Sequence, residues 1–290
     1  MALSTTPVDI NRGTTGLTLP ADLSNEVFAN AVQESAVMQL ARNIEIPGRG
    51  LSIPVVTGDP VADFVAETAE KPVSNATFST KTMTPYKVAV IETFSNEFRR
   101  DFARLYDELV RRLPYALGKK IDATVLGGTA PGTGFDVLTG STTIALGSTD
   151  VYGQLVAAMA AVTANGGDLT GWALSPQGIA ALMGTEDADK RPLFLNATEG
   201  GISQILGAPI IKAPAAFKAG TPNVLGYAGD WSKAAFGHVG AIDIAFSDQA
   251  TLNDGTNTIN LWQRNMFAVR AEFEVGFVVS DASAFAKITA

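Results

Sequence analysis

One apolar stripe, repeating every three or four residues, dominates the middle of this 290-residue sequence. This spacing matches the 3.6-residue period of an α-helix, so the sequence predicts a long helix over 94–122 with Ser95 as its N-cap. Such a helix is about 40 Å long. Pro114 is expected to kink it, divide it or mark a junction between two helices. The stripe consists of Phe94, Phe98, Phe102, Leu105, Leu109, Leu113 and Leu117.

A second strong pattern lies near the end of the chain and offers a surface for this helix. Large apolar residues alternate with polar or small ones from Phe267 to Phe277. Alternation of this kind predicts a long strand with one buried face, suited to packing beneath the helix. Between the two patterns, residues 150–248 show short helices and strands typical of an α/β unit. The sequence therefore predicts an α+β protein in which one domain is inserted into another.

Two segments cannot build a core of their own. Residues 51–93 predict an extended hairpin, with limbs at 51–57 and 84–93 and a polar stretch between them. Arms of this kind usually pack on another subunit or are mobile. Residues 1–20 have no apolar periodicity, and they are expected to be ordered only where neighbouring subunits cover them.

The composition removes several classes of chemistry. There is no Cys, which excludes disulfides and thiolate metal sites, and the single His238 excludes a His cluster. A Ser-His-Asp triad would have to use His238, whose Phe-Gly-His-Val-Gly context is more typical of a surface turn. We therefore expect no enzyme, no cofactor and no metal. No apolar run approaches the ~20 residues of a membrane span, and we expect no signal peptide.

The charge distribution is uneven along the chain. The net charge is −8, which disfavours tight binding of nucleic acid because phosphates need clustered cations. The exception is the predicted helix, where residues 95–122 hold seven basic and five acidic side chains. These cations favour a solvated helix face, and the alternative is an inward surface that tolerates nearby nucleic acid.

Short motifs that follow one another in order along most of the chain resemble the major capsid proteins of tailed bacteriophages, which have the Hong Kong 97-type fold. Each motif is weak alone, and the set is specific because its order is kept. The motifs are Glu70-Lys-Pro72, Thr77-Phe-Ser79, Gly127 to Gly134, Gly171-Trp-Ala-Leu-Ser-Pro176, Lys190-Arg-Pro-Leu-Phe194, Leu206-Gly-Ala-Pro209, Gly229-Asp-Trp-Ser-Lys233, Ile242 to Ser247 and Arg264-Asn-Met266 through Gly276.

The resemblance implies a fold divided along the chain into named parts. It implies a major capsid protein whose copies form hexamers and pentamers of an icosahedral shell around packaged double-stranded DNA. The alternative is an encapsulin-like bacterial nanocompartment, which has the same fold and holds enzymes. The expected parts are an N-terminal arm at 1–20, the first part of a peripheral domain at 21–50, an extended hairpin called the E-loop at 51–93, the spine helix and connecting loop at 94–134, an α/β axial domain at 135–248 and the C-terminal strands of the peripheral domain at 249–290.

The resemblance also implies partners and a possible covalent step. Besides other copies, we expect a portal protein, a possible decoration protein, non-specific contact with DNA, assembly in the host cytoplasm and a final place in the virion. Some relatives carry a long helical N-terminal scaffolding segment that is cleaved. No such segment is expected here, so we expect either a separate scaffolding protein, or a processed or scaffold-independent form. Some relatives join an E-loop Lys to an Asn with the help of a Glu, and the matching positions are Lys71, Asn265 and Glu272. The alternative is ordinary turn chemistry at Lys71 and strand-edge hydrogen bonds at the other two residues.

Overall fold

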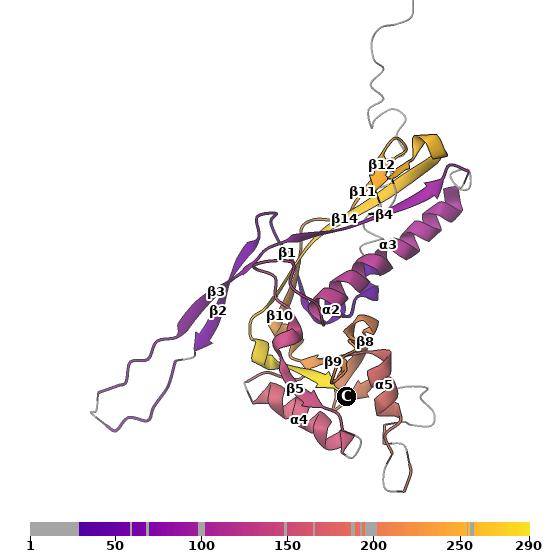
Figure 1. Cartoon of the computed structure of the whole chain (residues 1–290). Helices are drawn as coiled ribbons and strands as arrows, with labels where there is room; N and C mark the ends of the chain where they lie inside the picture. The colour runs from indigo at the N-terminus through magenta and orange to yellow at the C-terminus, as the bar shows by residue number, and fades with distance from the viewer. Residues whose placement is uncertain are drawn as a thin grey trace, which may run out of the picture.

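The computed structural model describes residues 29–58, 60–67, 70–97, 102–147, 150–164, 166–186, 189–191, 193–194, 202–253, 255 and 258–290. At 57, 102–111 and 114 it describes the backbone alone. The expected arm at 1–20 and the first residues of the expected peripheral-domain segment, 21–28, lie outside these residues. Figure 1 shows an elongated molecule with a layer of strands and a long helix, a second compact unit, and one projecting hairpin.

The first layer is a five-stranded sheet organised around one long strand. In it β14 pairs antiparallel with β4 over ten residues, from Met266 opposite Ser95 to Val275 opposite Tyr86. The strand β14 also pairs with β10 and β11, and β10 pairs with β1. The predicted alternation is confirmed, because the odd-numbered residues from Phe267 to Phe277 are buried. The strands are β1 (Arg42–Glu45), β4 (Tyr86–Ser95), β10 (Ala234–His238), β11 (Asp243–Ser247) and β14 (Met266–Val279).

Helix α3 (Phe102–Val125) lies along one face of this sheet (Figure 1). Its residues Leu113, Leu117 and Ile121 are buried in one core with the odd-numbered residues of β14. The helix runs through Pro114 without a break, so the division into two helices is wrong. A proline removes one backbone hydrogen bond, and the buried leucines on either side hold the helix together.

The predicted start of the helix is also wrong. Phe94 and Ser95 belong to β4, and the Phe94 ring stacks on Phe267 with centroids 5.6 Å apart. Phe94 fits the helical spacing, and it equally fits the two-residue period of Val88 and Val90 in the strand before it. Pairing with β14 decides between the two periods, because it joins β4 to β14 along ten residue pairs.

The second unit is a six-stranded sheet in the order β5-β15-β9-β6-β8-β7, with α4 (Val151–Thr163) and α5 (Pro176–Met183) packed on it. The sequence predicts short helices and strands over 150–248, and α4, α5, β6, β8 and β9 confirm them. Trp172 is fully buried, and its indole Nε1 donates to the Ile205 carbonyl at 3.1 Å. The strands are β5 (Thr142–Ala145), β6 (Gly171–Leu174), β7 (Gln204–Ile205), β8 (Ala208–Lys212), β9 (Val224–Gly229) and β15 (Phe285–Thr289).

The predicted boundary between the two units does not follow the sheets. Strands β10 and β11, predicted for the α/β unit at 135–248, pair with β14 in the five-stranded sheet. Strand β15, predicted for the first unit, lies between β5 and β9 in the six-stranded sheet. These memberships depend on long-range pairing, which local patterns do not carry.

The remaining elements complete the two units. Residues 29–34 are helical, and after a break at Ser35 the chain continues into α2 (Ala36–Leu40). Among the described residues, no helix is both long and apolar enough to cross a membrane. The other short elements are the hairpin of β12 (Thr251–Asn253) and β13 (Thr258–Asn260), and the 3₁₀ turns η2 (Leu138–Gly140), η3 (Pro214–Ala216), η4 (Trp231–Lys233), η5 (Trp262–Arg264) and η6 (Ala282–Ala284).

Candidate assembly surface

A two-stranded hairpin, β2 (Leu51–Gly58) and β3 (Thr77–Met83), projects from the body of the molecule (Figure 1). Its strands pair antiparallel, with Leu51 opposite Met83 and Val56 opposite Phe78. We call this hairpin the arm. The loop that joins its strands, residues 59–76, is called the arm tip. The predicted return limb at 84–93 was wrong, because most of it forms β4. The polar strand β3 carries no apolar pattern that could have identified it.

The arm exposes apolar side chains that an isolated subunit leaves in water. The Phe64 side chain is fully exposed, and the next most exposed are Val73 at 90%, Val61 at 74% and Phe78 at 70%. Clustered exposure of this kind marks an interaction site more often than single exposed residues do. In addition, β2 and β3 form a sheet of two strands, so each has an outer edge with unpaired backbone groups. Covering the arm with another chain would therefore lower the free energy of the system.

The base of the arm is locked into the five-stranded sheet. Met83 is fully buried in a small core with Ile46 and Val278. It lies against Gly237 and Gly276, which are paired across β10 and β14, and a Cβ at Gly276 would approach the Met83 Cγ to 2.7 Å. The two glycines therefore form a socket that only a residue without a side chain can provide. A glycine inside a strand signals such a close approach, and the sequence prediction missed it.

Polar contacts reinforce this base. Lys81 Nζ donates to Asp136 Oδ2 at 3.1 Å and to the Val279 carbonyl at 2.5 Å. The same carboxylate oxygen of Asp136 accepts from the Val279 backbone N–H at 3.0 Å. The direction in which the arm leaves the body is thus fixed by packing and by charge together.

The three candidate crosslinking residues do not come together within one chain. Lys71 lies in the arm tip, whereas Asn265 immediately precedes β14 and Glu272 lies within it. Seven residues of extended chain separate Asn265 from Glu272 by about 23 Å. Asn265 adopts a left-handed conformation with φ of 53°, and its Oδ1 accepts from Asn96 Nδ2 at 2.8 Å.

Glu272 is held by cations. Its Oε2 accepts from Lys87 Nζ at 2.9 Å, and its Oε1 lies 3.1 Å from Arg270 Nε. The hydrogen bond from Lys87 lowers the pKa of Glu272 below its usual range, and the same bond raises the pKa of Lys87. Glu272 is therefore an ionised carboxylate at neutral pH.

Asp122 of α3 was not singled out by the sequence, although it is buried. Its carboxylate accepts from Ser35 Oγ at 2.6 Å and from the backbone N–H groups of Ala36 at 2.9 Å and Val37 at 3.1 Å. Burial raises the pKa of Asp122, and these hydrogen bonds oppose the rise. Asp122 thus caps α2 and ties it to α3, which is a structural role.

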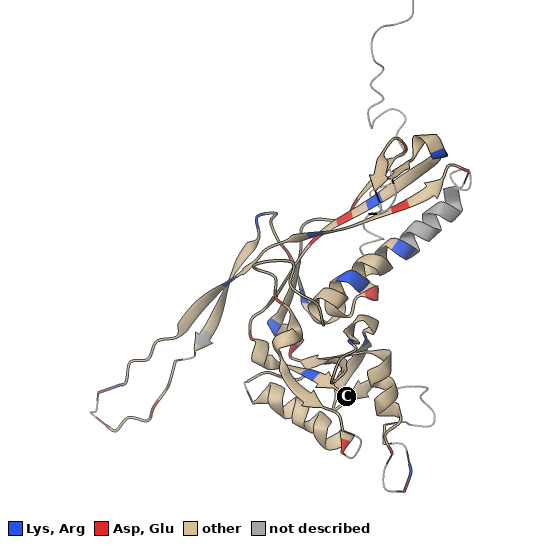
Figure 2. Cartoon of the chain, viewed as in Figure 1, with Lys and Arg blue, Asp and Glu red and all other residues tan. Residues whose placement is uncertain are grey.

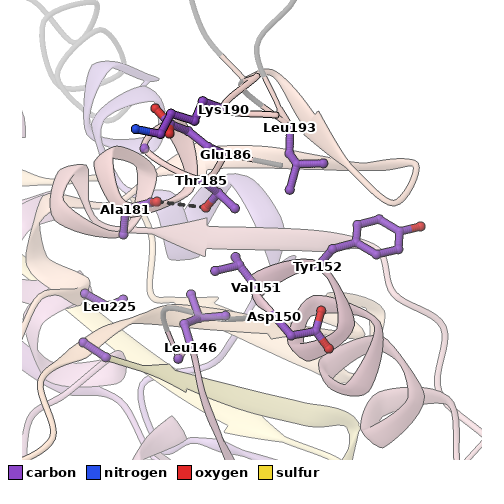
Figure 3. A pocket seen from close by; sticks show the side chains of 13 residues that line it. Leu146, Asp150, Val151, Tyr152, Ala181, Thr185, Glu186, Lys190, Leu193 and Leu225 are labelled. Atoms are coloured by element: carbon purple, nitrogen blue, oxygen red, sulfur yellow. Dashed lines mark hydrogen bonds between the residues drawn. The ribbon is translucent and has the colours of Figure 1, made fainter. Parts of the chain in front are cut away.

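A hollow of about 820 Å³ lies in the six-stranded unit, and Glu186 and Lys190 are among its lining residues (Figure 3). Two of its polar side chains serve nearby helix ends: Asp150 accepts from the Gly153 N–H at 2.9 Å, and Thr185 Oγ1 donates to the Ala181 carbonyl at 3.2 Å. His238, elsewhere, contacts the Gly240 carbonyl through Nδ1 at 3.0 Å and stacks on Phe273. Within the described residues, no three metal-ligating side chains are grouped together.

Comparison with known proteins finds a matching family and similar relatives over nearly the whole chain. Residues 15–290 match the phage capsid family. The chain is 30% identical over 289 residues to the probable major capsid protein gp17 of Mycobacterium phage D29, covering 93% of this chain and 89% of the relative. The corresponding protein of Mycobacterium phage L5 is 30% identical over 294 residues, with the same coverage.

Solved structures show the same fold. A chain from Gordonia phage Cozz is similar with a TM-score of 0.72 and 24% identity, covering 88% of this chain and 86% of that one. A chain from Mycobacterium phage Ogopogo gives a TM-score of 0.71 at 23% identity, covering 88% of this chain and 92% of that one. The capsid of a native GTA particle gives 0.63 at 15% identity, covering 100% of this chain and 98% of that one.

Proposed function

The chain belongs to the phage capsid family, and we propose that its copies join into hexamers and pentamers of an icosahedral shell around packaged double-stranded DNA. The resemblance seen in the sequence motifs is confirmed by the family match and by its relatives. The observation that carries the proposal is the projecting arm, whose exposed apolar side chains and two-stranded sheet are suited to contact with another chain. Large areas buried between copies then make the stability of each subunit depend on assembly.

In this proposal the parts of the subunit take the roles that the resemblance implies. The arm is the E-loop, α3 is the spine helix, the five-stranded sheet with α3 is the peripheral domain, and the six-stranded sheet with α4 and α5 is the inserted axial domain. Residues 1–20 form the N-terminal arm. A separate scaffolding protein, a portal protein and a possible decoration protein complete the particle, which assembles in the host cytoplasm.

Contact with DNA is non-specific in this proposal. The chain is acidic overall, and the described exposed charges of α3 are Arg112, Lys119 and Lys120, all positive (Figure 2). Because phosphate binding needs clustered cations, DNA is confined by the shell, and counterions balance most of its charge.

Electron microscopy tests the proposal directly. Particles isolated from the cells that produce the protein are expected to be closed shells whose DNA survives nuclease treatment. Shells that hold enzymes instead would favour the encapsulin-like alternative. A solitary, monodisperse subunit at high concentration, with no shells under any condition, would contradict the proposal.

We further propose that Lys71 of one copy and Asn265 and Glu272 of neighbouring copies meet when the arm docks. The separation of the three residues within one chain supports a site made between subunits. Deprotonated Lys71 Nζ would attack Asn265 Cγ, forming a new C–N bond while the side-chain nitrogen of Asn265 leaves as ammonia. The Glu272 carboxylate would take the proton from the attacking nitrogen and deliver it to the leaving one.

Denaturing gel electrophoresis of mature particles measures this step. We expect bands at multiples of the 30.3 kDa subunit, and we expect Lys71→Arg to leave only the monomer band because a guanidinium is not a nucleophile. Lys190→Arg, an exposed lysine of the other unit, is the matched control and should keep the ladder. A monomer band alone in wild-type particles would contradict the crosslink and leave the shell proposal intact.

A further inference from the structure

Asn96 and Asn265 face each other just beyond the last pair of the β4–β14 ladder, which is Ser95 with Met266. The Asn96 backbone N–H donates to the Asn265 carbonyl at 2.9 Å, and the Asn96 side-chain Nδ2 donates to Asn265 Oδ1 at 2.8 Å. Two hydrogen bonds therefore join the pair, one through the backbone and one through the side chains. Together they hold the Asn96 amide in a fixed position against the Asn265 carboxamide.

The fold bears two free-energy costs at this pair. Asn96 Oδ1 is buried and has no hydrogen-bond partner among the described residues, and an unpaired buried acceptor costs about 1–3 kcal/mol. Asn265 has a φ of 53°, in the left-handed region that glycine adopts more readily. Local costs of this kind are concentrated at functional sites. The Asn96 amide thus uses its donor end alone, and that end lies on the side-chain oxygen of Asn265.

The proposed crosslink needs a donor at this oxygen. When Lys71 Nζ bonds to Asn265 Cγ, the electron pair of the C=O bond moves to Oδ1, and the tetrahedral intermediate carries a negative charge there. The pair returns when the side-chain nitrogen of Asn265 leaves as ammonia, and the proton transfers stay with Glu272. Neither the nucleophile Lys71 nor the anion Glu272 can donate to Oδ1. Donors that stabilise such an oxyanion lie about 2.7–3.1 Å from it, and Asn96 Nδ2 lies 2.8 Å from Oδ1.

We propose that Asn96 is a further catalytic residue of the crosslink, and that its Nδ2 stabilises the negative charge that develops on Asn265 Oδ1. This inference rests on the crosslink of the proposed function and adds the group that activates its electrophile. The same hydrogen bond fixes the rotation of the Asn265 carboxamide, so its Cγ is presented in one orientation. Because Asn96 and Asn265 belong to one chain, the electrophile is prepared before a neighbouring copy arrives.

The rate of crosslinking in shells tests this role. Pulse-labelled chains are sampled at intervals after synthesis, denatured at once and run on a gel, and the loss of the 30.3 kDa band is timed. Asn96→Ala removes the donor and is expected to slow this loss about a hundredfold. Asn96→Asp should be slower still, because its carboxylate repels the oxyanion. Asn96→Gln keeps an amide donor on a longer stem and should recover part of the rate.

A purely structural tether predicts the opposite order for two of these variants. Aspartate keeps the shape of asparagine and can still accept a hydrogen bond, so a tether would tolerate Asn96→Asp better than Asn96→Ala. The matched control is Asn43→Asp, which makes the same charge change at an exposed asparagine of β1 in the same sheet. It should keep the wild-type rate.

Shells are available even for a variant that does not assemble alone. A tagged copy of that variant, which also carries Lys71→Arg, is co-expressed with wild-type chains. Such a copy can be joined to its neighbours only through its own Asn265, because it lacks the nucleophile. The rate at which tagged multimers appear therefore reports the effect of the substitution at Asn96.

The outcomes separate this inference from the proposals on which it rests. Crosslinking that slows progressively from Asn96→Gln through Asn96→Ala to Asn96→Asp, with the control unaffected, supports the role. Wild-type rates for Asn96→Ala and Asn96→Asp, a faster rate for Asn96→Asp than for Asn96→Ala, or an equal loss for Asn43→Asp overturn it while the crosslink stands. Wild-type shells that never form multimers contradict the crosslink and this inference together, and leave the shell proposal intact.

Discussion

Replacing Asp122 with alanine is expected to lower the free energy of unfolding of the unassembled subunit by about 3–5 kcal/mol. The substitution leaves the Ser35 hydroxyl and the N–H groups of Ala36 and Val37 without their acceptor inside the core. Each unpaired buried donor costs about 1–3 kcal/mol. Denaturant titration, followed by the emission of the buried Trp172 and Trp231, measures the change.

Asp122→Asn is the matched variant, because it keeps an acceptor oxygen and the volume of the side chain. It should cost less than alanine, and equal costs for the two would contradict the capping role. The difference between wild type and Asp122→Asn should also depend on pH. The folded pKa of Asp122 is raised, so its contribution is fully present below the unfolded pKa and is lost as pH rises through the folded pKa. The wild-type advantage should therefore be largest in acid.

Filling the socket at the base of the arm should have the second large effect. A Cβ at Gly237 would collide with Met83 Sδ and approach Ile46 Cδ1 to 2.9 Å. Gly237→Ala is expected to cost about 1–3 kcal/mol by overpacking, and Met83→Ala about 2–5 kcal/mol by leaving a cavity. Both changes should also reduce the yield of closed shells in electron micrographs, since they release the arm from its fixed direction.

The double variant separates a specific contact from general damage. With Met83→Ala in place, the Cβ of Gly237→Ala no longer meets the methionine. The free-energy cost of the double variant should therefore be smaller than the sum of the two single costs by about 1 kcal/mol or more. Gly48→Ala is the control glycine, because a Cβ added there would have no heavy atom within 4 Å, and its effect should stay within about 0.5 kcal/mol. Full additivity of Gly237→Ala and Met83→Ala would show that the socket does not couple them.

Sequence patterns predicted the elements that bury one continuous apolar face. The alternation of β14 and the apolar stripe of α3 each repeat over enough residues to be unambiguous, and the fully buried β6 is a short apolar run that ends before Pro176. Phe94 shows where this fails, because one residue fits both the helical and the strand period. Only its pairing partner Phe267, 173 positions later in the chain, decides between them.

The candidate site was predictable in part. The sequence placed an exposed arm at 51–93, but it assigned the wrong return strand, since β3 is polar and gains its pairing from β2. Met83 and Asp122 carry no local signal of their roles, because each depends on groups brought from distant parts of the chain. The order of the motifs identified the family that the structure and the relatives confirm.

Both sheets need strands from the last residues of the chain, which are the last to leave the ribosome. Strand β14 is the strand that β4, β10 and β11 all pair with, and β15 lies between β5 and β9. A nascent chain that stops before residue 266 lacks an inner strand of both sheets, so it can complete neither unit. Prematurely terminated translation products are therefore expected not to complete the fold, so in the proposed shell only polypeptides synthesised through both strands would be incorporated.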